Sequence, residues 1–183
     1  MYAYPVGLVL GRFQMLHNGH KQMIRSALDI CDTVLVLVGS AQEHNTQKNP
    51  YSYMRRLYIL QKVFRNEIKE GRLIVRPIND IGVGNTTKWG EYVLKTARDV
   101  YGLNPHIMIS GKEDRRESWF NDELAELFIP KAYEVSATAL RLAMLRDERE
   151  FWKQHVPVEI WDEYDDLRRL IIAAQENAET ASV

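Results

Sequence analysis

The chain has 183 residues, of which 45% are hydrophobic and 27% are charged, and its net charge is −1. This composition is that of an ordinary globular protein, and the length allows one domain with a sizeable core. The balanced charge excludes a general affinity for nucleic acid or acidic membranes, and no apolar run approaches the roughly 20 residues that cross a bilayer. A single cysteine excludes an intrachain disulfide and fits a reducing compartment, so we expect a cytoplasmic protein without membrane or nucleic-acid partners.

A glycine-bounded loop follows the first expected strand. The apolar run from Val6 to Leu10 predicts that strand, and the segment from Lys21 to Ile30 predicts a helix, with residues 11–20 between them. The first turn of a helix has unpaired N–H groups and a partial positive charge, so a strand, loop and helix in this order can hold a phosphate. Gly11 and Gly19 allow a ligand to approach the backbone closely.

Three side chains of this loop add hydrogen-bond donors: Arg12, His17 and His20. If the helix begins near Asn18, the two histidines lie on one face, where both imidazoles can bind one phosphate chain. The alternatives are a pair that caps the helix or packs in the core, and a pair that binds a metal. A metal site needs three or four ligands, and the other histidines and the cysteine show no suitable spacing. We therefore expect no metal bound by histidine.

The segment Gly-Arg-Phe-Gln-x-x-His-x-Gly-His resembles the signature of the nucleotidyltransferase superfamily that carries the His-x-Gly-His motif. Within that superfamily it is most similar to the nicotinamide mononucleotide adenylyltransferases of the archaeal and related type. The chain departs from them at Met15, where these enzymes usually have proline. Proline fixes a backbone angle, so the difference concerns the stiffness of the loop and removes no ligand-contacting side chain.

The run from Thr33 to Val38 is typical of a strand buried on both faces, and it completes a parallel βαβ unit. Residues 39–43, Gly-Ser-Ala-Gln-Glu, leave its carboxyl end, where ligands bind in open α/β sheets. Together with residues 48–50 this block resembles the second conserved segment of the same enzymes. The resemblance implies that Ser40 and Gln42 contact nicotinamide mononucleotide.

Ser52 predicts the N-cap of a helix that extends to about Ile68. Arg55 and Arg56 are adjacent, hence on different faces of that helix, and at most one of them is expected to face the site. The resemblance implies that an arginine at this helix start lies near the nucleotide. A surface position stays open for either residue.

Residues 73–78 predict the third strand, and a turn-rich loop follows up to a helix from Lys88 to Tyr101. Trp89 falls in the first turn of that helix. It can pack in the core, or stack on a flat, positively charged pyridinium ring. The resemblance implies the second role, with Asn85 as a further contact to the mononucleotide.

Residues 106–110 predict the fourth strand, and another glycine loop leaves it. Gly111 permits close approach of a ligand, and Lys112 offers a positive charge to a phosphate. Arg115 and Arg116 either reach the ligand or lie in a solvated turn. We expect a short helix from Ser118 to Phe128 next.

A fifth strand is expected around residues 131–135, directly before a second motif. Ser136 is a natural N-cap, so its hydroxyl, that of Thr138 and the guanidinium of Arg141 can converge on an anion with the N–H groups of the new helix. This Ser-x-Thr-x-x-Arg segment resembles the C-terminal signature of the superfamily, which implies that it holds the triphosphate.

The C-terminal part is expected to be helical from about residue 148. Pro157 is well placed to start a helix from Val158 to Ala174, and residues 176–183 are expected to form a flexible tail. We therefore predict one domain over residues 1–175.

The expected fold is a doubly wound, Rossmann-like α/β domain, with a sheet of about five parallel strands and helices on both faces. The candidate site residues are mostly cationic or hydrogen-bond donors, which suits a polyphosphate. The chain lacks the Gly-x-x-x-x-Gly-Lys-Ser/Thr loop, so a P-loop NTPase is excluded. The resemblance implies an enzyme that transfers AMP from ATP to nicotinamide mononucleotide, giving NAD and pyrophosphate.

The implied roles fall into three groups. The catalytic residues are Arg12, His17, His20 and Arg141; the ATP or phosphate contacts are Gly11, Phe13, Gly19, Gly111, Lys112, Ser136 and Thr138; the mononucleotide contacts are Ser40, Gln42, Asn85 and Trp89. No protein residue is expected to bind a metal directly, because Mg²⁺ can be held mainly by substrate phosphates and water.

Two alternatives stay open. The acceptor can be another phosphorylated molecule, such as phosphopantetheine or glycerol phosphate, or the protein can be a nucleotide sensor without activity. Relatives of this kind tend to be oligomers, which leaves a homo-oligomer open. The preference between the nicotinamide and nicotinic acid forms of the substrate is also open.

Overall fold

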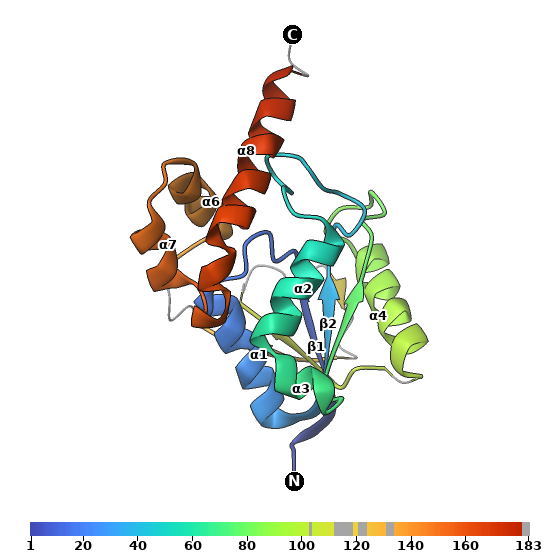
Figure 1. The fold of residues 1–183 in the computed structure, drawn as a ribbon. Coiled ribbons are helices and arrows are strands. Elements are labelled where there is room, and N and C mark those ends of the chain that lie inside the picture. The colour runs from blue at the N-terminus through green and yellow to red at the C-terminus, as the bar shows by residue number, and fades with distance from the viewer. Residues whose placement is uncertain (103, 112–118, 121–123, 131–133, 181–183) are drawn as a thin grey trace.

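A computed structural model describes residues 1–102, 104–111, 119–120, 124–130 and 134–180 (Figure 1). Five parallel strands form one sheet in the order β3-β2-β1-β4-β5. The chain builds outward from β1 to β3 and then returns to the other side of β1 for β4 and β5, which confirms the doubly wound fold. The strands are β1 (Tyr4–Gly11), β2 (Cys31–Val38), β3 (Leu73–Pro77), β4 (Ile107–Ser110) and β5 (Ala125–Phe128).

Helices lie on both faces of the sheet, as predicted. In Figure 1, α1, α2, α3 and α8 lie on one side of the strands and α4 lies on the other. The helices are α1 (Asn18–Ile30), α2 (Tyr53–Val63), α3 (Arg65–Lys69), α4 (Thr87–Tyr101), α6 (Ala137–Leu145), α7 (Arg149–His155) and α8 (Tyr164–Thr180), with a 3-10 helix, η2 (Val158–Glu163), before the last. None of the described helices is both long enough and apolar enough to cross a membrane.

The central strands are buried on both faces, which explains their continuous apolar sequence. Alternate residues of β1 and β2 face opposite sides of the sheet. Leu8, Leu35 and Leu37 pack with α4, through Val93 and Ala97. The intervening residues, Val9, Val34, Val36 and Val38, belong to the larger core with α1, α2 and the C-terminal helices.

Two predicted helix caps are present. The Ser52 hydroxyl accepts a hydrogen bond from the backbone N–H of Arg55 at 3.2 Å, and the Ser136 hydroxyl accepts one from that of Ala139 at 3.1 Å. The helix after Ser52 is shorter than expected, because α2 ends at Val63 and α3 follows after Phe64. Phe64 is fully buried at this break.

The prediction was wrong between the fourth strand and the second motif. Residues 125–128 form β5 instead of the end of a helix, and Glu134 and Val135 lie in no strand. Ala, Glu and Leu are good helix formers, but here the segment pairs along β4, from Ala125 opposite Ile107 to Phe128 opposite Ser110. Pairing with a neighbouring strand overrides the weak helix preference of such a short segment.

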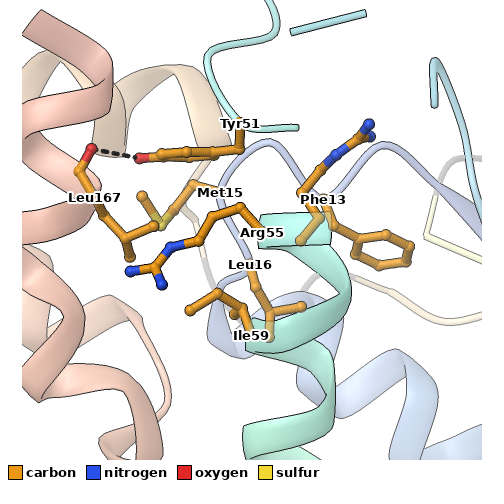
Figure 2. Close-up of a pocket in the computed structure, with 8 residues that line it drawn as sticks. Phe13, Met15, Leu16, Tyr51, Arg55, Ile59 and Leu167 are labelled. Atoms are coloured by element: carbon orange, nitrogen blue, oxygen red, sulfur yellow. Dashed lines mark hydrogen bonds between the residues drawn. The ribbon is translucent and has the colours of Figure 1, made fainter. Parts of the chain in front are cut away.

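Met15, which stands where proline was expected, is only 2% exposed. Its side chain extends from the first loop toward α2 and α8. There it borders a void of about 10 Å³ that Leu16, Ile59 and Leu167 also line (Figure 2). A void of this size is at the lower limit for one water molecule. Packing of the methionine side chain therefore anchors the loop to α2 and α8, where a proline ring would have stiffened its backbone.

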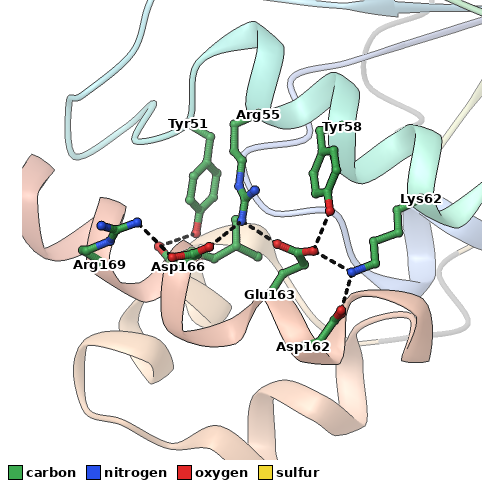
Figure 3. A network of polar contacts seen from close by, with 9 residues as sticks. Tyr51, Arg55, Tyr58, Lys62, Asp162, Glu163, Asp166 and Arg169 are labelled. Carbon is green, nitrogen blue, oxygen red and sulfur yellow. Dashed lines mark hydrogen bonds and ion pairs between the residues drawn. The ribbon is translucent and has the colours of Figure 1, made fainter.

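Charged side chains also join α2 to the C-terminal helices (Figure 3). Arg55 pairs with Glu163 at 2.7 Å, and Tyr58 donates a hydrogen bond to the same carboxylate at 3.0 Å. Glu163 is 7% exposed, so this contact is partly buried and is screened less by water than a surface pair. Lys62 completes the group by binding Glu163 and Asp162.

The C-terminal helices share the larger core with the sheet, through Trp152, Ile160, Tyr164 and Leu167. The expected helix from Val158 begins as the 3-10 helix η2 and becomes α-helical at Tyr164. It continues to Thr180, so residues 176–180 are helical, and the flexible tail stays a prediction. The single domain over residues 1–175 remains a prediction.

Candidate active site

A cavity of about 630 Å³ opens at the carboxyl edge of the sheet. This is the edge at which doubly wound sheets bind ligands, and the volume lies within the range of small-molecule sites. Residues at or after the carboxyl ends of all five strands line it: Gly11 for β1, Gly39 for β2, Asp80 for β3, Gly111 for β4 and Ile129 for β5.

The first loop places an aromatic ring over its own backbone. A Cβ atom on Gly11 would lie 2.9 Å from the ring of Phe13, so a larger residue there would displace that ring. Phe13 has φ +51°, in the left-handed region that bulky residues rarely adopt. Its ring meets that of His20 edge to face, at 5.0 Å between centroids. A strained backbone at this point is the kind of feature that functional loops retain.

The two histidines lie side by side, as their spacing predicted. His17 is the N-cap of α1 and His20 is in its first turn, and their rings stack at 3.7 Å between centroids and 25° between planes. A Cβ on Gly19 would lie 3.1 Å from the His17 ring, so glycine at this position leaves room for the stack. Both rings line the cavity.

Burial lowers the pKa of His20 well below its usual range, and the neighbouring His17 lowers that pKa further. A backbone hydrogen bond with Met15 opposes both effects but does not outweigh them. His20 is therefore neutral at pH 7 in the free protein, with a single ring N–H. An anion bound beside it would favour its protonated form.

The second motif reaches back to the first loop. The Arg141 guanidinium donates to the carbonyl oxygen of Gln14 at 2.6 Å and to the Thr138 hydroxyl at 3.3 Å. Burial lowers the pKa of Arg141, but an arginine stays protonated at neutral pH. Ser136, Thr138 and Arg141 all line the cavity, so the two motifs form one site.

Gln14 was not predicted to have a role, yet it fixes the first loop. Its side chain is 3% exposed and bonds the backbone of Tyr51 in both directions, accepting from the N–H at 2.9 Å and donating to the carbonyl at 2.8 Å. The Gln14 carbonyl also accepts from Arg141. This residue therefore holds the loops after β1 and β2 and the start of α6 together.

Arg56 lies behind the cavity wall, and only 2% of it is exposed. Its guanidinium donates to the carbonyl oxygens of Arg12 at 2.8 Å, Gly39 at 2.6 Å and Ser40 at 3.0 Å. Burial lowers its pKa to about 10, so it remains charged at pH 7. Arg56 thus holds the chain where it leaves β1 and β2, whereas Arg55 points to Glu163, and neither lines the cavity.

Trp89 lies in the first turn of α4 and lines the cavity, as predicted. Its ring packs near Tyr92 at 5.7 Å and Trp119 at 6.3 Å between centroids. The next residue, Gly90, permits this packing, because a Cβ there would lie 1.7 Å from the carbonyl oxygen of Trp119. The aromatic wall of the cavity therefore depends on a glycine that the sequence pattern did not single out.

The structure brings most of the predicted residues to this cavity. Those that line it are Gly11, Arg12, Phe13, His17, Gly19, His20, Ser40, Asn85, Trp89, Gly111, Ser136, Thr138 and Arg141. Gln42 does not, because its exposed side-chain amide bonds the backbone of Asp80 instead. Lys112, Arg115 and Arg116 lie outside the described residues. Lys48 and Asp80 also line the cavity, although neither was assigned a role from the sequence.

Within the described part of the chain, no three His, Cys, Asp or Glu side chains come together as a metal site.

Comparison with known proteins identifies the family. A sequence model of the cytidylyltransferase-like family matches residues 8–165. The nicotinamide-nucleotide adenylyltransferase of Thermococcus kodakarensis is 31% identical over 163 residues, which are 82% of this chain and 77% of that protein. The enzyme of the same name from Saccharolobus solfataricus is 30% identical, over 85% of this chain and 87% of its own length. The chain belongs to the cytidylyltransferase-like family and, within it, to the nicotinamide-nucleotide adenylyltransferases. This confirms the predicted family and the predicted enzyme class, nucleotidyltransferase.

The fold of this nucleotidyltransferase is also that of a solved relative. A bifunctional NMN adenylyltransferase/ADP ribose pyrophosphatase from Francisella tularensis, crystallised with AMP and a manganese ion, matches with a TM-score of 0.72 at 19% identity. The match covers 94% of this chain and 51% of that one, so the chain spans about half of the bifunctional protein.

Proposed function

We propose that the protein transfers AMP from ATP to nicotinamide mononucleotide, giving NAD and pyrophosphate, as a step of NAD biosynthesis. The observation that carries this proposal is the composition of one cavity. Its wall combines two helix N-termini and the cations of both motifs with a tryptophan in the first turn of α4. The first group suits a polyphosphate, and the second suits a flat cationic ring.

ATP would lie with its phosphates between the two motifs. The N–H groups at the starts of α1 and α6, the hydroxyls of Ser136 and Thr138, and the guanidinium groups of Arg12 and Arg141 are the donors available there. His17 and His20 extend this set along the phosphate chain. Donors fixed in advance stabilise the charge that develops on the leaving pyrophosphate without having to reorganise.

The attacking group needs no catalytic base. A phosphate monoester has a second pKa near 6, so the 5′-phosphate of the acceptor is mostly ionised at pH 7. The protein therefore has to bring this anion in line with the α-phosphorus and offset the repulsion between the two substrates. The arginines suit this task because they donate hydrogen bonds and carry positive charge, and His20 suits it because an anion bound beside it favours its protonated form.

We propose that Mg²⁺ enters with ATP, held by phosphate oxygens and water, since Mg²⁺ usually keeps several waters at substrate phosphates. The ion offsets the charge of the triphosphate. We also propose a cytoplasmic location, which the single cysteine supports. A homo-oligomer is a further expectation, and measurement of the native mass tests it.

The test is pyrophosphate release from ATP and Mg²⁺ with one acceptor at a time: nicotinamide mononucleotide, nicotinic acid mononucleotide, phosphopantetheine or glycerol 3-phosphate. We expect release with a pyridine mononucleotide, and a dinucleotide should form at the same rate. Release only with another acceptor would keep the chemistry and overturn the substrate. No release from a protein that still binds nucleotide would favour a sensor.

The sensor alternative rested on Met15. Since Met15 packs between the first loop and α8, outside the cavity, its presence does not impair the ligand-facing surface. This supports an active enzyme.

A further inference from the structure

The cavity contains one carboxylate among many donors and cations. Of the described residues that line it, Asp80 is the single acidic one, whereas the basic ones are Arg12, His17, His20, Lys48 and Arg141. A carboxylate in a cavity for two negatively charged substrates repels both, so its presence needs a specific reason.

The carboxylate is held by the loop that follows β2. The Ser40 hydroxyl donates to Asp80 Oδ2 at 2.6 Å. The side-chain amide of Gln42 bonds the Asp80 backbone in both directions, at 3.1 Å and 3.3 Å. Contacts from two neighbouring residues thus fix both the side chain and the main chain of Asp80.

Ser40 itself is held firmly. It is 4% exposed, its carbonyl accepts a hydrogen bond from buried Arg56, and its φ of +48° lies in the left-handed region. A serine in this conformation costs free energy that the surrounding contacts must offset. The chain therefore maintains a strained residue whose hydroxyl holds the Asp80 carboxylate, as expected of a built site.

Asp80 also begins the segment that leads to the aromatic wall. The loop after β3 carries Asp80 and Asn85 and leads into α4, whose first turn holds Trp89, and all three residues line the cavity. Under the proposed function, Trp89 stacks on the pyridinium ring of the mononucleotide. A carboxylate in the loop that leads to Trp89 would then lie on the side of the cavity that receives the ring.

The two forms of the substrate differ at that ring. Both carry a positive ring nitrogen, but nicotinamide has a neutral carboxamide with N–H donors, whereas nicotinic acid has a carboxylate. A fixed carboxylate attracts the cationic ring and can accept from the carboxamide, but it repels a second carboxylate. We infer that Asp80 selects the nicotinamide form of the mononucleotide over the nicotinic acid form. This inference rests on the proposed function.

The experiment measures kcat/KM for nicotinamide mononucleotide and for nicotinic acid mononucleotide, from pyrophosphate release at saturating ATP and Mg²⁺. The wild type should prefer the nicotinamide form by about tenfold or more, the size of a charge effect across a partly hydrated site. Asp80→Asn keeps the shape and removes the charge, so it should reduce that preference by about tenfold, chiefly by improving use of the acid form.

Ser40→Ala provides a second variant, because it leaves the carboxylate in place but frees it from its partner. It should reduce the preference in the same direction by a smaller factor. Asp99→Asn is the control, since Asp99 is an exposed carboxylate on α4 that pairs with Lys95 and does not line the cavity. It removes the same charge and should leave the preference unchanged.

The outcomes separate the two proposals. A wild type that uses neither pyridine mononucleotide would overturn the proposed function, and the inference with it. A wild type that uses them, but with a preference that Asp80→Asn and Ser40→Ala leave unchanged, would overturn the inference alone. An equal loss with both substrates would instead assign Asp80 to a part they share, such as the ribose. If Asp80→Asn fails to fold, an unchanged preference in Ser40→Ala decides against the inference.

Discussion

Two regions of the cavity are built in different ways. The phosphate region, from the β1–α1 loop and the start of α6, presents cations and helix N-termini, and Arg141 joins its two parts through Gln14. The pyridine region, from the loops after β2 and β3 and the first turn of α4, presents Trp89, Asn85 and the carboxylate of Asp80. One region is positive and rich in donors, and the other is aromatic with a negative group.

This difference favours one orientation of the substrates in the cavity. A triphosphate is stabilised by the first region and repelled by the second, whereas a cationic ring has the opposite preference. Both substrates contain phosphate, so a uniformly positive site would bind them in several orientations. The separation of charge favours the orientation in which the two phosphate groups meet and the pyridine ring lies at Trp89.

The largest expected effect comes from the phosphate region. Arg141→Ala should lower kcat by about 10²–10³, because a positioned donor to the developing charge is lost. Arg146→Ala is the matched control, since this exposed arginine follows the same helix, and it should change kcat by no more than about twofold. Steady-state kinetics with both substrates checks the pair. A wild-type kcat in Arg141→Ala would remove that residue from the phosphate region.

Arg56 lies behind the cavity wall, and its replacement should lower the free energy of unfolding. Arg56→Leu leaves the carbonyl oxygens of Arg12 and Gly39 without their donor, whereas that of Ser40 keeps the N–H of Glu43. At about 1–3 kcal/mol for each unsatisfied group, the free energy of unfolding should fall by about 2 kcal/mol or more. Denaturant titration measures this, and Arg65→Leu on the exposed side of α3 should change it by no more than about 0.5 kcal/mol. Equal losses in both variants would contradict the role of Arg56.

The pyridine region should respond more mildly. Trp89→Ala should raise KM for nicotinamide mononucleotide by about tenfold, since stacking and cation–π contacts are each worth about 1 kcal/mol. KM for ATP should stay within about twofold, which corresponds to less than about 0.5 kcal/mol. Trp161→Ala, in an exposed tryptophan of η2, controls for the loss of an indole ring. Equal effects on the two substrates would return Trp89 to a purely structural role.

The smallest effect is a pH dependence of stability. The pKa of His20 is lowered in the folded protein, so below its ordinary value of 6.5 the unfolded chain binds a proton that the folded chain does not. The free energy of unfolding should therefore fall with decreasing pH below 6.5, by at most about 1.4 kcal/mol per pH unit from this group, and not depend on it above. His20→Asn should show a shallower fall between pH 7.5 and 5 in denaturant titrations. Identical slopes would show that the folded state does not disfavour protonation of His20.

Sequence alone predicted what depends on local pattern. The glycine loop, the histidine spacing and the cap at Ser136 are short-range features, and each appeared where expected. The continuous apolar run of β2 likewise identified a strand with helices on both faces.

The remainder depends on contacts between distant segments. Arg55 and Arg56 are neighbours with the same side chain, and only the positions of Glu163 and of the carbonyl groups behind the cavity separate their roles. β5 forms because β4 lies beside it, although its own residues favour a helix. No sequence pattern pointed to Asp80, because its proposed role depends on its position in the fold. It is the one carboxylate among the described residues that line a positive cavity.

The most direct test of this substrate orientation is a crystal structure of the protein with nicotinamide mononucleotide and a non-hydrolysable ATP analogue. We expect the triphosphate against Arg12, the histidine pair and Arg141, and the pyridinium ring on Trp89 beside Asp80. A pyridine ring among the cations, or a triphosphate at Trp89, would contradict the account.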